Sequence, residues 1–364
     1  SGTGLGSQVD IIADSLRIGA VADNEPGIQL LASQLETLGA DSLLVGGRRE
    51  GSADGLVIDA RAAAIEVAAG VDLELPELIL AANRITVDST EDAPTRLQST
   101  GSNAAETEVL LLEGDAGIIA VSDRSLTLER TSAAGDEAGS ISVTPDATLA
   151  ASGSIIVDVA GDVDVAGSFD AAGALINLGA SAITIGETGS QQDVDGLQLS
   201  NEKLAALQGS RLRLRTGNFI TVAGELVAGE SGQDIVLGSL LLDAQGIQGI
   251  ANVGLTTRMV ADEIRLSNTS GLSPVPDSAG PTGGALAFVT NTLTLSGPET
   301  GSGRFQVKGY SEDEVEAKSA VLGDKDAELY VEAPLAIDAP VISGTTGARG
   351  VITVAGADLT VTGA

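Results

Sequence analysis

The sequence predicts an all-β chain, a β-solenoid in which short strands stack in successive coils. Two observations favour this fold class. A three-residue strand motif recurs along the 364 residues, and the composition is rich in small residues and poor in aromatic ones. We therefore expect one continuous solenoid over residues 1–364, an internal piece of a larger protein, with a sub-boundary at residues 270–284.

The recurring motif is an aliphatic residue, a threonine and a second aliphatic residue. Because successive side chains of a strand point to opposite faces, the aliphatic pair lies on one face and threonine on the other. Each copy therefore predicts a short, half-buried strand. The copies are Ile85-Thr86-Val87, Leu126-Thr127-Leu128, Ile183-Thr184-Ile185, Ile220-Thr221-Val222, Leu293-Thr294-Leu295, Ile352-Thr353-Val354 and Leu359-Thr360-Val361.

Strand signals are densest between Ile155 and Ile185, where glycine or alanine separates them. Strands of about four to six residues with connections this short fit neither a βαβ fold nor a sandwich with long loops. Coils of roughly 20 to 25 residues would give on the order of 16 coils. At about 4.8 Å between strands, the stack would be roughly 75 Å long.

Composition supports thin, regular layers. Aromatic residues make up 2% of the chain, and there are 47 glycines, so a thick aromatic core is excluded. The apolar fraction of 43% is that of a folded protein.

Two segments depart from the strand pattern, and a third reads as a loop. Ile28 to Ala40 carries leucines at helical spacing, and Ser200 to Gly209 is rich in helix formers, so both predict short flanking helices. Strands are expected directly afterwards, at Ser42 to Gly46 and Arg211 to Arg215. The proline- and glycine-rich stretch from Ser270 to Gly284 predicts a loop.

The net charge of −32 would repel phosphate backbones, which excludes nucleic acid as a partner. The acids are expected to coat a large solvated surface; a role in collecting divalent cations is the alternative. Absence of cysteine is typical of large exported surface proteins. The chain begins at Ser1 and has no run of 18 apolar residues.

Missing residue types argue against an enzyme. Without histidine and cysteine, the usual triads, most zinc sites and thiol nucleophiles are unavailable. The alternative that stays open is a carbohydrate-active β-helix, a polysaccharide lyase or glycosidase that works with paired carboxylates. We predict no catalytic and no cofactor-binding residues.

Several acidic groups are candidate cation or catalytic sites. Asp162 with Asp164, and Asp72 with Glu74, should point outward from one strand face, roughly 7 Å apart, which favours a solvated acidic stripe. The runs Glu312 to Glu316 and Asp324 to Glu328 lie in loop-like sequence, where oxygen ligands suit Ca²⁺. The glycine-rich nonapeptide of calcium-binding β-rolls is absent, so we predict no metal site.

Basic residues gather at two places. Arg211, Arg213 and Arg215 should stand on one outer face, where they either balance acids of neighbouring coils or receive an acidic partner or polyanionic glycan. Arg48 and Arg49 form a smaller pair of the same kind.

Four segments resemble large exoproteins of the filamentous haemagglutinin family, which are exported by two-partner secretion. They are LLASQLETLGADSLLVGGRR (30–49), LSNEKLAALQGSRLRLRTGNFITVAGEL (199–226), LLLDAQGIQG (240–249) and DEIRLSNTSG (262–271). The final part, 329–364, is similar to the generic strand repeats of such proteins. The resemblance implies a right-handed parallel β-helix, an extracellular or outer-membrane-associated location, and a role in adhesion, aggregation or biofilm.

The resemblance also implies partners. It points to a receptor or glycan on a host or neighbouring cell, and to an outer-membrane transporter that is engaged during export. The family's secretion domain carries Asn-Pro motifs and this chain has no Asn-Pro dipeptide, so the transporter should bind a region outside the chain. Uncapped strand edges predict self-association into filaments as a further property.

Overall fold

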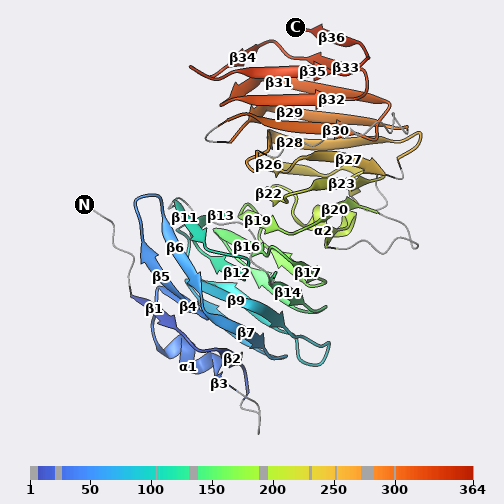
Figure 1. Cartoon of the computed structure of the whole chain (residues 1–364). Helices are drawn as coiled ribbons and strands as arrows, with labels where there is room; N and C mark the ends of the chain where they lie inside the picture. Colours follow the sequence, from blue (N-terminus) through green and yellow to red (C-terminus); the bar gives the residue numbers. More distant parts are fainter. Residues whose placement is uncertain are drawn as a thin grey trace. The chain divides into compact units, whose positions relative to one another are not determined.

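A computed structural model describes residues 7–20, 27–103, 105, 107–130, 138–187, 196–228, 232–250, 252–271, 283–298 and 301–363. The chain is nearly all β with parallel sheets (Figure 1). It divides into two compact units, Ser1–Ser181 and Ala182–Ala364. Most of the expected loop from Ser270 to Gly284 lies outside the described residues.

The first unit consists of short strands and one helix. They are β1 (Gln8–Ile11), β2 (Ser15–Ile18), β3 (Ile28–Leu30), α1 (Ala32–Thr37), β4 (Ser42–Val45), β5 (Gly47–Gly51), β6 (Leu56–Ala60), β7 (Ala62–Val67), β8 (Asp72–Leu75), β9 (Glu77–Val87), β10 (Arg96–Ser99), β11 (Thr107–Leu112), β12 (Gly117–Ser122), β13 (Ser125–Arg130), β14 (Ser140–Val143), β15 (Thr148–Ala150), β16 (Ser154–Asp158), β17 (Asp162–Val165), β18 (Ser168–Asp170) and β19 (Leu175–Gly179).

A four-stranded parallel sheet, β8-β10-β15-β18, shows how the alternation of the sequence becomes a core. In register, Leu73, Leu97, Leu149 and Phe169 form one buried column. The residues between them point outward. Stacking in register therefore buries one face of every strand without any long side chain.

The pairing in the first unit is not parallel throughout. Strand β12 runs antiparallel to both of its neighbours, β9 and β16, and β5 runs antiparallel to β6. A large apolar cluster fills the space between β6, β11 and β13 on one side and β4, β9, β12 and β16 on the other. Its members are Leu44, Leu56, Ile58, Ile79, Ala81, Leu110, Leu112, Ile118, Ala120, Leu126, Leu128 and Ile156.

The second unit contains β20 (Ile183–Gly186), β21 (Leu197–Leu199), α2 (Asn201–Ala206), β22 (Arg211–Arg215), β23 (Phe219–Ala223), β24 (Val227–Ala228), β25 (Gln233–Asp234), β26 (Val236–Asp243), β27 (Gly246–Ile250), β28 (Thr256–Ser267), β29 (Ala285–Ser296), β30 (Gly303–Lys308), β31 (Glu312–Asp324), β32 (Ala327–Val331), β33 (Leu335–Asp338), β34 (Ile342–Gly344), β35 (Gly350–Val354) and β36 (Leu359–Thr362).

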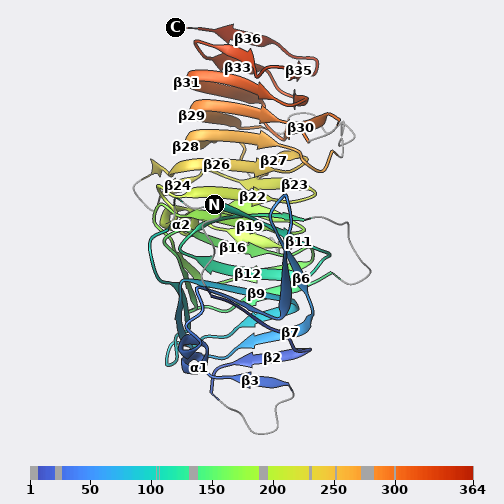
Figure 2. The ribbon, with the colours of Figure 1, turned by 90° about the vertical axis from the view of Figure 1, so that its left-hand side faces the viewer.

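Two parallel sheets dominate this unit, and the chain visits them in turn (Figure 2). One contains β22, β26, β28, β29, β31, β33, β34 and β36; the other is β21-β20-β23-β27-β30-β32-β35. Side-chain hydrogen bonds between adjacent strands join residues 24 to 29 positions apart, somewhat longer than the expected step. An interior column runs through Leu212, Leu240, Ile264, Leu293 and Val321, all buried.

The last strands are exposed. Ile342, Leu359 and Val361 continue the registers of buried residues, yet each is about half exposed, at 47%, 47% and 54%. Each of the strands β34, β35 and β36 has a partner along one edge.

The two helices were expected, with different accuracy. Helix α2 fits the Ser200 to Gly209 prediction, and the Ser200 hydroxyl caps it by accepting the Lys203 amide at 3.3 Å. Helix α1 is shorter than the predicted Ile28 to Ala40 segment because Ile28 and Leu30 join β3, which pairs with β2. Within the described ranges, no helix has the length and apolar character needed to cross a membrane.

Candidate functional site

The alternating acid pairs lie where the sequence indicates. Asp162 and Asp164 are exposed on β17, and Asp72 and Glu74 are exposed on β8, with buried aliphatic residues between them. Throughout the part of the chain that the structure describes, no three Asp or Glu residues come together as a metal site would require. These positions are solvated stripes.

The stretch from Glu312 to Glu316 is not a loop, contrary to the prediction, but the start of the long strand β31. Strand alternation places Glu312 and Glu314 outside and turns Asp313 inward. Glu316 faces Arg258 of β28 at 3.7 Å. The prediction failed because the acids hide a period-two pattern in which Asp313, Val315 and Ala317 form the inner face.

The stretch from Asp324 to Glu328 joins β31 to β32, and two of its acids are ion-paired. Asp324 pairs with Arg265, and Glu328 accepts a hydrogen bond from Arg304 Nε at 2.8 Å. Thr353 also donates to Glu328, at 2.8 Å. Carboxylates held in this way neutralise the arginines of neighbouring strands.

The arginines of β22 alternate as expected, each half-buried between buried leucines. Arg213 lies 3.9 Å from Asp243 of the adjacent strand β26. This contact is of the cross-strand, charge-balancing kind that the sequence favours.

Arg48 and Arg49 are adjacent but differ in environment. The Arg48 side chain is 57% exposed, near Glu50 and Asp59. The Arg49 side chain is only 5% exposed; it forms an ion pair with Asp10 at 2.6 Å and donates to the Ser42 hydroxyl at 2.6 Å.

A buried charge cluster in the first unit was missed by the sequence reading. Glu77, fully buried, accepts hydrogen bonds from Arg124 at 2.6 Å, from Ser122 at 2.8 Å and from Ser42. Arg124 also donates to Glu108 at 2.9 Å. Antiparallel pairing of β9 with β12 sets Glu77 opposite Ser122, a relationship that no local sequence signal reveals.

Charge and burial shift the pKa values in this cluster. Burial raises the pKa of Glu108, Arg124 opposes the rise, and Glu77 adds to it. The pKa of Arg124 is raised by the two carboxylates despite its partial burial. Every charge here has a partner, so the cluster is built as a structural ion network.

A second buried polar group lies in the second unit. Asp313 is 2% exposed and Tyr310 1% exposed, and the carboxyl oxygens of Asp313 and the Tyr310 hydroxyl have no hydrogen-bond partner of normal geometry among the described protein groups. Burial raises the pKa of Asp313 to about 8, with a further contribution from Glu312.

Two half-exposed aromatic rings lie on one face of the sheet containing β23, β30 and β32. Lys308 stands over the Phe219 ring at 4.2 Å from its centre, and Arg304 stands over Tyr330 at 5.2 Å. Both cations come from β30. Because cations already cover these rings, the pairs brace neighbouring strands.

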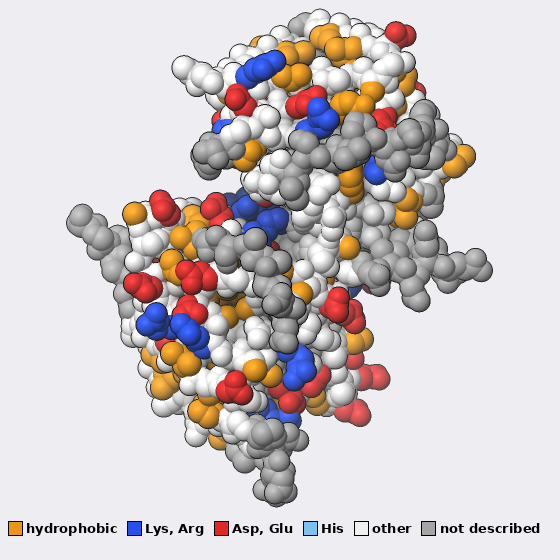
Figure 3. Space-filling view, in the orientation of Figure 1, with side chains coloured by type: hydrophobic (Ala, Val, Ile, Leu, Met, Phe, Trp, Pro, Cys, Tyr) orange, Lys and Arg blue, Asp and Glu red, His pale blue; other side chains and the backbone are white. Residues whose placement is uncertain are grey.

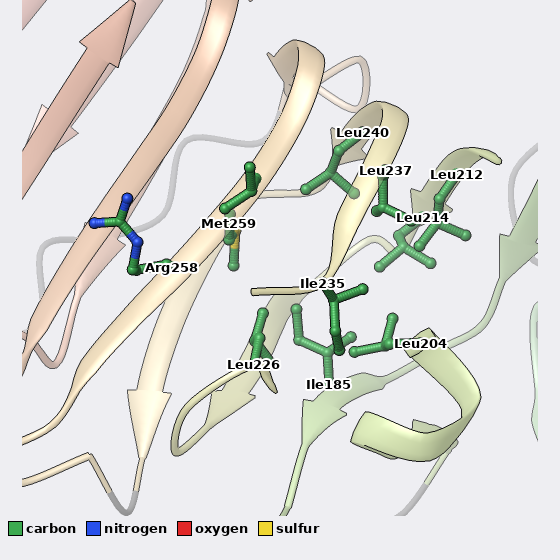
Figure 4. Close-up of a pocket in the computed structure, with 11 residues that line it drawn as sticks. Ile185, Leu204, Leu212, Leu214, Leu226, Ile235, Leu237, Leu240, Arg258 and Met259 are labelled. Atoms are coloured by element: carbon green, nitrogen blue, oxygen red, sulfur yellow. The ribbon is translucent and has the colours of Figure 1, made fainter. Parts of the chain in front are cut away.

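An apolar cavity of about 30 Å³ lies beside α2 (Figure 4). Leu204 of α2 points into it together with Ile185, Leu226, Ile235 and Met259. A cavity that binds benzene measures about 150 Å³, so this one is too small for a substrate of ordinary size.

An open surface depression of about 260 Å³ is lined by Ser302, Asp326, Glu328, Arg349 and parts of β32 and β35. It brings two carboxylates and an arginine to one place. The Asp326 carboxylate accepts the backbone amide of Arg349 at 3.1 Å, and Glu328 is engaged as described above.

Acidic and basic side chains are interspersed over the face seen in Figure 3. Comparison with known proteins yields no relative: no protein-family model matches the chain, no curated protein is similar to it, and no solved structure matches it.

Proposed function

We propose that the chain is a right-handed parallel β-helix and that it serves as a stalk segment of a large, secreted or cell-surface bacterial adhesin. The observation that carries this proposal is the register of the second unit, in which the chain returns to the same two parallel sheets about every 24 to 29 residues. A chain that coils in this way adds length with each turn.

The charges support a structural role. The acids that could gather a substrate are either solvated singly, as on β8 and β17, or engaged by arginines of adjacent strands. Histidine and cysteine are absent from the sequence. The adhesive part of the proposal, the extracellular location and the partners rest on the resemblance to filamentous haemagglutinin exoproteins.

Electron microscopy of the purified chain tests the stalk. We expect elongated particles; a compact globule would contradict the proposal. Handedness follows from an experimental structure at side-chain resolution, in which left-handed coils would overturn that part alone.

Adhesion needs a separate test. Beads coated with the chain should bind host or bacterial cells more than beads coated with the heat-denatured chain. Equal binding by both would contradict an adhesive surface within these residues. Glycosidase treatment of the cells then separates a glycan receptor from a protein receptor.

A carbohydrate-active enzyme is the second candidate, and the 260 Å³ depression with Asp326, Glu328 and Arg349 is the observation that favours it. Incubation with acidic polysaccharides should release unsaturated or reducing ends if this reading holds, and Asp326→Asn should abolish the release. We expect no release, because Glu328 is already paired with Arg304.

A further inference from the structure

Asp313 interrupts an interior column of mainly aliphatic side chains. The column runs in register through Thr257, Leu286, Asp313, Leu335 and Leu359. The Asp313 amide donates to the Pro334 carbonyl at 2.9 Å, so the backbone is tied into the stack. The carboxyl group is nearly fully buried without a protein partner, and an unpaired carboxylate is costly in such a place.

The turn before β31 fixes the nearest polar neighbour, Tyr310. A Cβ atom at Gly249 would lie 2.6 Å from Tyr310 Cζ, so the ring packs directly on the β27 backbone. Gly309 adopts φ +81° and its carbonyl accepts Asn252 Nδ2 at 3.1 Å. The Tyr310 ring therefore has little freedom to turn away from Asp313.

The titratable groups that act on Asp313 are Tyr310 and Glu312. Burial, followed by Asp313, raises the pKa of Tyr310 above its ordinary value, so this phenol stays neutral; Thr257 partly opposes the rise. Glu312 is exposed and adds negative charge. In register, β29 offers Leu286 and β33 offers Leu335, neither of which can compensate an anion.

We propose that Asp313 is a proton-dependent latch of the second unit: the neutral acid keeps β31 packed against β33, and loss of the proton loosens the strands that follow. The asymmetry comes from pairing. Strand β29 pairs with β31 over most of its length, whereas β33 has four residues and β34 three. The proposal does not depend on an adhesive role.

The direction follows from proton linkage. The folded-state pKa of about 8 lies above the ordinary value of 3.8, so the folded unit binds the proton more tightly than the unfolded chain. The stability contributed by this group is fully present below pH 3.8 and is lost as pH rises towards 8.

Hydrogen exchange of the full chain at pH 6 and pH 9, corrected for base catalysis with the unfolded chain, tests the latch. In the wild type we expect peptides from β33 to β36 to lose protection at pH 9, while peptides from β8 and β10 do not. Asp313→Leu, which completes the leucine column, should remove the pH dependence. Glu314→Gln, an exposed carboxyl of the same strand, should behave as the wild type.

Equilibrium unfolding in urea supplies a second readout. Both tyrosines lie in the second unit and the chain has no tryptophan, so tyrosine fluorescence reports that unit. Between pH 5 and pH 8, the unfolding constant of the wild type relative to Asp313→Leu should rise about tenfold per pH unit. A constant ratio, or equal pH dependence of exchange in wild type, Asp313→Leu and Asp313→Asn, would overturn the latch.

Discussion

The Glu77 carboxylate accepts a hydrogen bond from Arg124 at 2.6 Å in the interior of the first unit, where the Glu77 side chain is fully buried. Two serine hydroxyls, from Ser42 and Ser122, complete its coordination. The pair therefore joins three strands, β4, β9 and β12, and the turn before β13. Its removal has consequences that an exposed ion pair would not have.

Arg124→Met should destabilise the first unit by about 3 to 5 kcal/mol, because it leaves the Glu77 charge buried without its main partner. Urea unfolding followed by far-ultraviolet circular dichroism measures the loss, and tyrosine fluorescence identifies the separate transition of the second unit. The matched control is Arg48→Met, whose exposed ion pairs contribute about 0 to 1 kcal/mol. Similar losses for both variants would contradict a structural role for the buried pair.

Glu108→Gln should leave stability at pH 7 within about 0.5 kcal/mol of the wild type or slightly higher. The raised pKa of Glu108 means that the folded unit disfavours its charged form. The stability contributed by this group is present below its ordinary pKa of 4.5 and is lost as pH rises through the folded-state value. Glu77→Gln should be the more damaging change in the same unfolding experiment; the reverse order would refute this account.

Ile264→Ala should cost about 2 to 5 kcal/mol, because Ile264 is 1% exposed between Leu240 and Leu293. Thr294→Ala on the half-exposed outer face of β29 should change stability by no more than about 0.5 kcal/mol. Urea unfolding with tyrosine fluorescence compares the two. If the costs are equal, the aliphatic column does not hold the strands together.

Two glycines with nearly equal backbone angles give a steric test. Gly309 has φ +81° and a Cβ atom there would lie 2.5 Å from the Gly249 carbonyl oxygen, whereas Gly209 has φ +79° and open space. Gly209→Ala should cost about 1 kcal/mol from backbone strain alone. Thermal unfolding should show a clearly larger loss for Gly309→Ala, and an equal loss would mean that the turn before Tyr310 relaxes freely.

Much of the local structure follows from the sequence because the strand signal is local. All copies of the aliphatic-threonine-aliphatic motif lie in strands, and the segment Arg211 to Arg215 is β22. The exposed acids of β8 and β17 follow from the same alternation. Strand and face are set by neighbours one and two residues away.

Features that depend on distant pairing could not be read in this way. The partnership of Glu77 with Arg124 depends on β12 lying antiparallel to β9, and β3 replaces the first turn of the predicted helix because it pairs with β2. Asp313 is an intermediate case. Its inward position follows from the spacing to Val315 and Ala317, but its burial depends on β29 and β33.

The reversed strand β12 limits how the protein can change length in evolution. In the second unit, duplication of a segment that contributes one strand to each sheet adds a parallel neighbour, and every later side chain keeps its face. In the first unit, a duplicated β12 would have to lie beside an antiparallel neighbour, so insertions are tolerated only when they restore strand direction. Natural variants that differ by whole repeats should therefore carry their insertions after Ala182.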